Sequence, residues 1–151
     1  MCIRDSIYNE TLRDRVCAVS NKTHYNEMNV LSMHALIGAY QPQGYEWVDE
    51  LNQVLADNIE YFCDYVDEHF EGVSYSRPQG TYMVFLDCTE WCREHGRDIQ
   101  WLLDEGARVG VGYQDGRPFH GPCHIRVNLA LPLSRVREAC DRLDRYVFNA
   151  R

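Results

Sequence analysis

The sequence predicts a protein of the α/β class, in which a small β-sheet is covered by helices and preceded by one long helix. Three observations lead to this fold. Apolar residues recur at helical spacing over residues 45–70, two short β-favouring segments occupy 81–86 and 124–129, and an amphipathic helix follows Pro132. The chain has 151 residues, which is enough for one ordinary domain carrying extra helices.

The first predicted element is a short helix over residues 29–40, which the Gln41-Pro42-Gln43-Gly44 stretch breaks. A long helix over 45–70 comes next. Its apolar residues alternate in steps of three and four: Val48, Leu51, Leu55, Ile59, Phe62, Val66 and Phe70. This helix of about seven turns is long for a globular domain and suits an element that joins two bodies. A simple core helix explains the spacing equally well.

Strands are predicted beyond this helix. A short strand over residues 72–75 precedes the segment 81–86, whose apolar composition predicts a strand buried on both faces. Two further strands are expected at 109–113 and 124–129, on either side of a polar loop.

Helices are predicted to alternate with these strands. Asp98 is placed to cap a helix that reaches about Glu105, and Gly106 is expected to end it. The last helix begins at Pro132 or Ser134. Its inner face is predicted to carry Val136, Cys140, Leu143 and Val147.

Composition excludes several classes of function. Acidic residues outnumber basic ones 23 to 15, for a net charge of -8, whereas nucleic-acid binders need a cationic face. No apolar run approaches the roughly 20 residues that a membrane helix requires. The first six residues contain no apolar signal segment, so a cytoplasmic location is expected. The seven cysteines are expected to be reduced thiols that serve mostly in packing.

Arg126 is the residue that points most directly to chemistry. Period-two alternation places it with His124 and Asn128 on one face of the strand, opposite Ile125, Val127 and Leu129. An arginine in an apolar strand needs an anion, and its planar fork suits a carboxylate. Asn128 is placed to orient that fork. From the residues alone, an internal salt bridge explains Arg126 at least as well as a ligand does.

Several segments together resemble a known family. Gly80-Thr81-Tyr82 opens a strand that ends at Asp87, and Ile125-Arg126-Val127-Asn128-Leu129-Ala130 precedes the last helix. This pattern resembles the C-terminal small domain of fold-type I pyridoxal-phosphate (PLP) enzymes, and is most similar to the cystathionine β-lyase-like (C–S lyase) branch of the class I/II aminotransferases. Further similarity lies in residues 7–13, 29–32, 45–51 and 114–119.

The resemblance implies a division of the chain. Residues 7–43 correspond to the tail of the large PLP-binding domain, 44–70 to the interdomain helix and 71–151 to the small domain. Residues 1–6 match nothing in the family and are interpreted as foreign to it. The whole enzyme is then expected to use pyridoxal 5'-phosphate on a small amino-acid substrate, as a homodimer.

The resemblance also assigns roles to residues. Arg126 matches the arginine that binds the substrate α-carboxylate, while Gly80 and Tyr82 match the turn and strand that close over the substrate. Lys22 is the only lysine, and it follows the segment that the family's Schiff-base lysine should precede. This chain is therefore expected to lack that lysine and to be inactive alone, and a lyase and an aminotransferase both fit the pattern.

Two alternatives of other classes remain. One is a metal-binding domain, since cysteines and histidines form two clusters at Cys88, Cys92 and His95, and at His120, Cys123 and His124. The absence of a Cys-x-x-Cys pair disfavours zinc, so no metal is predicted. The other alternative is a stand-alone interaction domain built on the long helix.

Overall fold

The computed structural model describes residues 7–23 and 29–150, so the six residues interpreted as foreign lie outside the described part. The chain divides into two compact units, residues 1–47 and 48–151. The division falls inside helix α3 (Pro42–His69). No helix among the described residues is long and apolar enough to cross a membrane.

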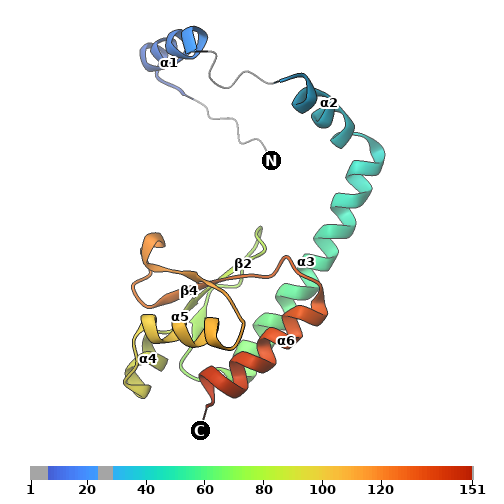
Figure 1. Ribbon diagram of the computed structural model, residues 1–151. Helices are drawn as coiled ribbons and strands as arrows, with labels where there is room; N and C mark the ends of the chain where they lie inside the picture. The colour runs from blue at the N-terminus through green and yellow to red at the C-terminus, as the bar shows by residue number, and fades with distance from the viewer. Residues whose placement is uncertain (1–6, 24–28, 151) are drawn as a thin grey trace. The chain divides into compact units, whose positions relative to one another are not determined.

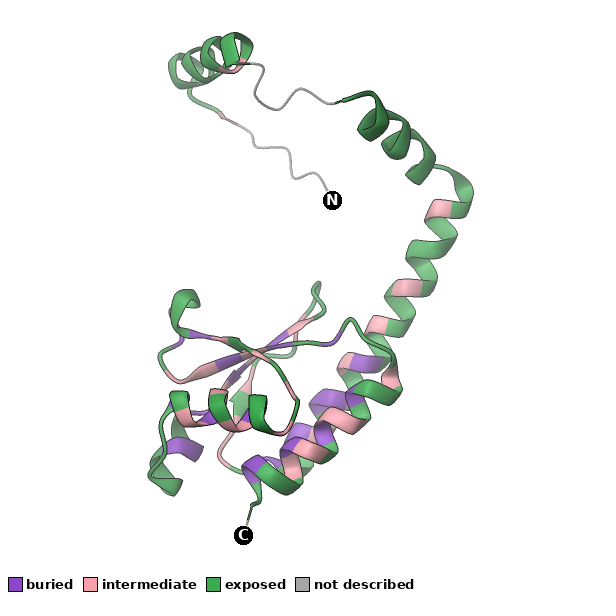
Figure 2. Cartoon of the chain, in the orientation of Figure 1, coloured by how far each residue is buried: buried purple, intermediate pink, exposed green. Residues whose placement is uncertain are grey.

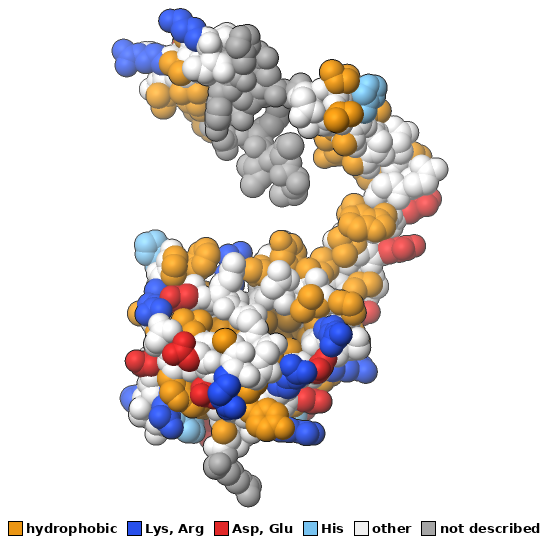
Figure 3. Space-filling view, viewed as in Figure 1, with side chains coloured by type: hydrophobic (Ala, Val, Ile, Leu, Met, Phe, Trp, Pro, Cys, Tyr) orange, Lys and Arg blue, Asp and Glu red, His pale blue; other side chains and the backbone are white. Residues whose placement is uncertain are grey.

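The first unit contains helices α1 (Glu10–Thr23) and α2 (Val30–Ala39), neither of which holds a buried residue. Asn29 caps α2 by accepting a 2.9 Å hydrogen bond from the Ser32 amide at its side-chain oxygen. Figure 2 shows both helices almost wholly exposed, and Figure 3 shows hydrophobic side chains on the surface of α2. Apolar residues before Gly44 are therefore exposed, with Val30 at 65% and Ile37 at 54%.

Helix α3 is the predicted long helix, but it begins at Pro42 rather than at residue 45. Proline suits the first turn of a helix because its missing N–H has no partner there in any case. Along the predicted apolar stripe, Phe62 and Val66 are fully buried, whereas Val48 is 43% exposed. Asn58 is also buried, although its polarity gave no sign of this in the sequence.

The second unit is built on a four-stranded antiparallel sheet with the strand order β1-β2-β4-β3. Figure 1 labels its two central strands, β2 and β4. Its strands are β1 (Ser74–Tyr75), β2 (Met83–Asp87), β3 (Gln114–Asp115) and β4 (His124–Asn128). The two central strands pair along their full length, with Val84 opposite Val127 and Phe85 opposite Arg126.

One face of this sheet carries the core. Val84, Leu86, Ile125 and Val127 point into a cluster that also contains apolar residues of α3, α5 and α6. The alternation predicted for residues 124–129 is therefore confirmed. The expectation that residues 81–86 are buried on both faces is wrong, because the alternate positions in β2, beginning with Met83, are only half-buried.

The helices of this unit are α4 (Thr89–His95), α5 (Ile99–Arg108), the 3-10 turn η1 (Arg117–Phe119), α6 (Leu133–Leu143) and its π-helical continuation η2 (Asp144–Phe148). Helices α3 and α6 run side by side (Figure 1). The Tyr65 hydroxyl on α3 donates a 3.2 Å hydrogen bond to the Asp144 carboxylate. The inner face predicted for the last helix is confirmed, since all four of its residues are buried.

Two expectations near the end of α5 are wrong. Gly106 lies inside this helix, and residues 109–113 form a loop rather than a strand. A Cβ at Gly106 would lie 2.5 Å from the ring of Tyr113, whose hydroxyl donates to the Leu102 carbonyl. The missing side chain thus admits Tyr113 against α5, and this packing holds residues 109–113 away from the sheet.

Candidate functional site

The second face of the sheet carries polar and aromatic side chains and is the candidate site. We call it the open face, and its residues are Met83, Phe85, Asp87, Gln114, His124, Arg126 and Asn128. They are half-buried or exposed, in contrast to the buried residues on the opposite face. Antiparallel pairing places directly opposed residues on the same face. Arg126 therefore lies between Phe85 on β2 and Gln114 on β3.

Arg126 is held in this position by neutral groups. Its Nη1 donates a 3.2 Å hydrogen bond to Oε1 of Gln114. Its guanidinium carbon lies 4.7 Å from the ring centroid of Phe119, which extends from the turn η1. An amide oxygen and an aromatic face both attract a cation without neutralising its charge.

No carboxylate of the described residues pairs with Arg126. The ion pairs in this part of the chain involve other basic groups, and the nearest in sequence is the contact of His124 with Asp87 at 3.7 Å. The internal salt bridge considered for Arg126 is thus not found among these residues. Because Arg126 is half-buried, it retains a strong tendency to bind an anion. Its fork is suited to a carboxylate.

Asn128 lies on the open face as predicted, but it makes a different contact from the one expected. Its Oδ1 accepts a 2.8 Å hydrogen bond from the amide of Ala130, two residues further along the chain. The side chain that contacts the guanidinium is Gln114 instead. The sequence did not identify the surroundings of Arg126. The strand register places Gln114 and Phe85 beside it, and the turn η1 supplies Phe119.

The open face also carries an acidic side chain, Asp87, at the C-terminal end of β2. Asp87 accepts hydrogen bonds from the Thr89 amide at 2.9 Å and from the Thr89 hydroxyl. Nδ1 of His124 lies 3.7 Å from Asp87, and its ring lies against Phe85 with the centroids 4.6 Å apart. Burial opposes ionisation of Asp87, but the hydrogen bonds from Thr89 and the nearby His124 outweigh it and lower the pKa of this carboxyl.

The loop that follows η1 is fixed against the open face at Gly121, which is buried. A Cβ at this position would lie 2.5 Å from the ring of Phe85 and 2.6 Å from Cβ of His124. The absence of a side chain therefore brings the backbone close to the ring that neighbours Arg126. The loop after η1 is thus packed directly against Phe85 and His124.

Gly80 and Tyr82 line a different hollow. It measures about 680 Å³ and lies between the 77–82 segment and residues of α3 such as Leu55 and Ile59, and Arg126 does not border it. Tyr82 is 44% exposed, and its carbonyl accepts a 2.9 Å hydrogen bond from the Leu129 amide. The structure thus places Arg126 and Asn128 on one face and the predicted closing residues beside α3.

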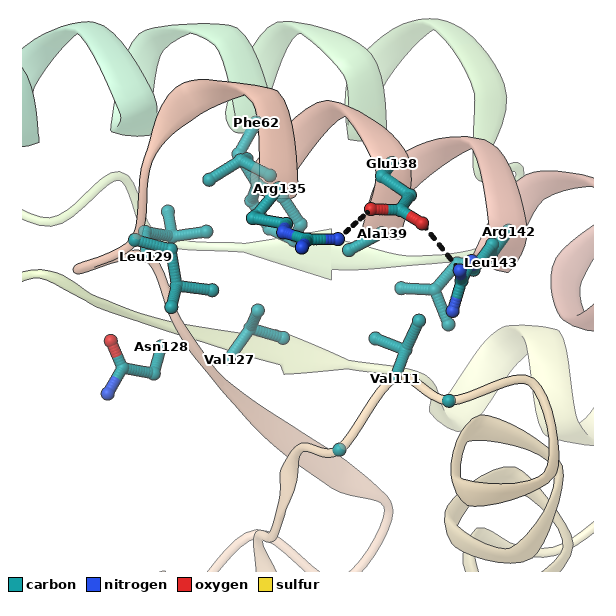
Figure 4. A pocket seen from close by; sticks show the side chains of 14 residues that line it. Phe62, Val111, Val127, Asn128, Leu129, Arg135, Glu138, Ala139, Arg142 and Leu143 are labelled. Atoms are coloured by element: carbon teal, nitrogen blue, oxygen red, sulfur yellow. Dashed lines mark hydrogen bonds and ion pairs between the residues drawn. The ribbon is translucent and has the colours of Figure 1, made fainter.

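A second cavity, of about 350 Å³, lies on the core side of the sheet against α6 (Figure 4). Arg135 and Arg142 border it, and both donate to the carboxylate of Glu138, at 2.7 and 2.5 Å. The Arg135 hydrogen bond and the charge of Arg142 hold the pKa of Glu138 below its ordinary value. Because these cations already share a carboxylate, this cavity is a weaker candidate for binding an anion than the open face.

The cysteine and histidine clusters do not form a metal centre within the described residues, where no group of three or more suitable side chains is assembled. His95 is turned away, with its ring stacked on Trp91 at 4.4 Å between centroids and its Nδ1 2.9 Å from the Trp91 carbonyl oxygen. The cysteines Cys88, Cys92 and Cys123, in contrast, lie close together.

The sequence of this chain is similar to those of known proteins. Residues 7–143 match the family model described as aminotransferase class I and II. The chain is 35% identical over 124 residues to a Mycobacterium leprae protein named "Putative cystathionine beta-lyase", covering 72% of this chain and 30% of that protein. It is 30% identical over 135 residues to Protein MalY of Escherichia coli, covering 87% of this chain and 34% of MalY.

A solved structure shows the same fold. The PLP-bound C-S lyase from Staphylococcus hominis superposes with a TM-score of 0.75 at 24% sequence identity, over 91% of this chain and 35% of that one. The α/β fold predicted from the sequence is thereby confirmed. The chain spans about a third of the length of the curated relatives it matches.

Proposed function

Because the chain belongs to the aminotransferase class I and II family, we propose that it is the C-terminal part of a pyridoxal-phosphate-dependent C–S β-lyase acting on amino acids. The names of its relatives, cystathionine beta-lyase and C-S lyase, support this reaction class. The proposed enzyme cleaves the bond between Cβ and sulfur, and releases a thiol, ammonia and a 2-oxo acid. The homodimeric state proposed for the whole protein rests on the family resemblance.

The role proposed for this chain is to bind the substrate α-carboxylate through Arg126. The observation that carries this proposal is a half-buried guanidinium held by Gln114 and Phe119, with no carboxylate partner among the described residues. A substrate carboxylate approaching the open face would supply the missing anion through two parallel hydrogen bonds. Asn128 is proposed to line the same site, and Gly80 with Tyr82 to lie where the substrate is enclosed.

No residue of this chain is proposed to attach the cofactor covalently. Pyridoxal phosphate, when bound, supplies the electron sink that makes the substrate Cα–H acidic, and it is attached through a lysine. No lysine is among the residues of the open face, and the chain's single lysine, Lys22, lies in the last turn of α1. The family's Schiff-base lysine should precede the segment that matches residues 7–13, so we propose that the lysine of the whole enzyme lies outside this sequence.

An Arg126→Lys variant of the proposed full-length enzyme tests the role of this residue. Lysine keeps the charge but loses the bidentate fork, so affinity for the amino acid should fall by about 2–4 kcal/mol, the cost of disrupting a desolvated charge pair. The corresponding amine without a carboxylate should bind wild type and variant alike, and the absorbance of bound cofactor should be unchanged. Unaltered affinity for the amino acid would overturn the proposal.

Arg137→Lys is the matched control. The Arg137 guanidinium also lies over an aromatic ring, 5.2 Å from the centroid of Tyr61, but away from the open face. This variant should bind the amino acid as the wild type does. Product analysis separates the lyase from the aminotransferase of the same superfamily, because β-elimination releases ammonia and a thiol whereas transamination needs a 2-oxo acid as amino acceptor.

A further inference from the structure

Three cysteines from two parts of the sequence meet beside the open face. Cys88 follows β2, Cys92 lies in α4 and Cys123 immediately precedes β4. The Cys88 amide donates a 2.9 Å hydrogen bond to the Cys123 carbonyl, and the Cys92 amide donates one of 2.9 Å to the Cys88 carbonyl. These two bonds place α4 against the start of β4. Because Cys92 follows Cys88 by four residues in this turn, the two side chains lie on the same face of α4, and both interact with Cys123.

These thiols differ in their access to solvent. Cys88 is 0% and Cys92 5% exposed, whereas Cys123 is half-buried and is the member of the group that solvent reaches. Burial, the hydrogen bond to Cys123 and nearby acidic groups raise the pKa of Cys92 to about 12. Burial likewise raises the pKa of Cys88. Attack on a reagent should therefore begin at Cys123, because the thiolate is the nucleophile.

We propose that Cys92 and Cys123 form a redox-active dithiol that closes to a disulfide by exchange with a small organic disulfide. The Cys123 thiolate attacks one sulfur of the reagent, forms a mixed disulfide and expels the first small thiolate. Cys92, as its thiolate, then attacks the Cys123 sulfur and displaces the second thiolate, which takes up a proton from the solvent. The protein loses two electrons and two protons, and the reagent is reduced to two thiols.

A Cys92–Cys123 disulfide would link α4 to the start of β4. It would enclose residues 92–123 in a covalent loop. Closing a loop restricts the unfolded chain and stabilises the folded one. The cross-link would also fix the start of β4, because Cys123 lies three residues before Arg126. Oxidation is thus expected to raise the melting temperature of the chain.

The experiment uses the 151-residue chain with Cys2 and Cys17 replaced by serine, so that the exposed Cys17 and the N-terminal cysteine do not react. Hydroxyethyl disulfide, a small uncharged reagent, is added, and intact mass and peptide maps are recorded without reduction. The expected product has lost the mass of two hydrogen atoms and carries a Cys92–Cys123 link. A stable hydroxyethyl adduct on Cys123, or no reaction at either thiol, would refute the proposal.

Matched variants within the cluster complete the test. Cys92→Ala should stop the reaction at the mixed disulfide on Cys123, and Cys123→Ala should leave Cys92 unmodified in the folded chain. Cys88→Ala should still form the link, and a bond from Cys123 to Cys88 in the parent chain would overturn the assigned pairing. Because the peptide map of the parent protein needs none of these variants, a variant that fails to fold does not prevent the test.

Discussion

The guanidinium carbon of Arg126 lies 4.7 Å from the ring centroid of Phe119, a residue from the turn η1. The ring attracts the cation through its π face and takes up none of its conventional hydrogen-bond donors. One of these already reaches Gln114. The contact therefore orients the group while leaving its charge unneutralised.

Replacing this ring should weaken substrate binding modestly. In the proposed full-length enzyme, Phe119→Leu removes a cation–π contact that contributes about 0.5–1 kcal/mol at an exposed site, so KM for the amino acid should rise a few-fold. The rate constant kcat should change less than KM. Arg97→Gln is the control, since it breaks a cation–π pair with Trp101 of the same 4.7 Å length elsewhere. Equal effects of the two variants on KM would contradict this role for Phe119.

Asn58 should contribute strongly to stability. From α3, its side-chain amide donates to the carbonyls of Leu129 and Leu131, at 2.8 and 2.7 Å, and so fixes the turn after β4. Asn58→Leu leaves both carbonyls without this donor, which should cost about 1–3 kcal/mol in the free energy of unfolding. Urea unfolding of the chain measures this. Asn52→Leu, at an exposed position of the same helix, should change the stability little.

The Gly106→Ala substitution should affect the stability of the chain in two opposite ways. Alanine stabilises a helix interior by about 0.5–1 kcal/mol relative to glycine. Here the new Cβ would lie 2.5 Å from the Tyr113 ring, and overpacking of this kind costs about 1–3 kcal/mol. The variant should therefore be less stable in urea than the parent chain. In a Tyr113→Leu background the same substitution should be neutral or stabilising, and a loss as large as in the parent would show that Tyr113 is not responsible.

Asp87 should make the stability of the chain depend on pH in the acid range. Its folded pKa lies below the ordinary value of 3.8, because the hydrogen bonds from Thr89 and the charge of His124 outweigh its burial. The ionised carboxylate therefore stabilises the fold above the unfolded pKa, and this contribution disappears as the pH falls through the folded value. Asp87→Asn should show a smaller fall in melting temperature between about pH 6 and about pH 2. Identical pH profiles would contradict the prediction.

The local features of the C-terminal unit follow from the sequence alone. Period-two alternation separated Arg126 from Ile125 and Val127, because successive side chains of a strand point to opposite faces. Asp98 caps α5 as predicted, accepting a 2.8 Å hydrogen bond from the Trp101 amide at its side chain. Each of these features depends on residues close together in the chain, where backbone geometry fixes the spacing.

Tertiary structure decided what surrounds Arg126. Gln114 and Phe85 flank it only because β4 pairs with β3 and β2 in one register, and a shift of one residue would turn every side chain to the other face. The core that sets this register is assembled from α3, α5 and α6, and so depends on contacts between distant parts of the sequence. Tertiary packing also outweighed the sequence pattern of residues 109–113, which predicted a strand. The Tyr113 ring fills the space beside Gly106, and this segment forms a loop outside the sheet.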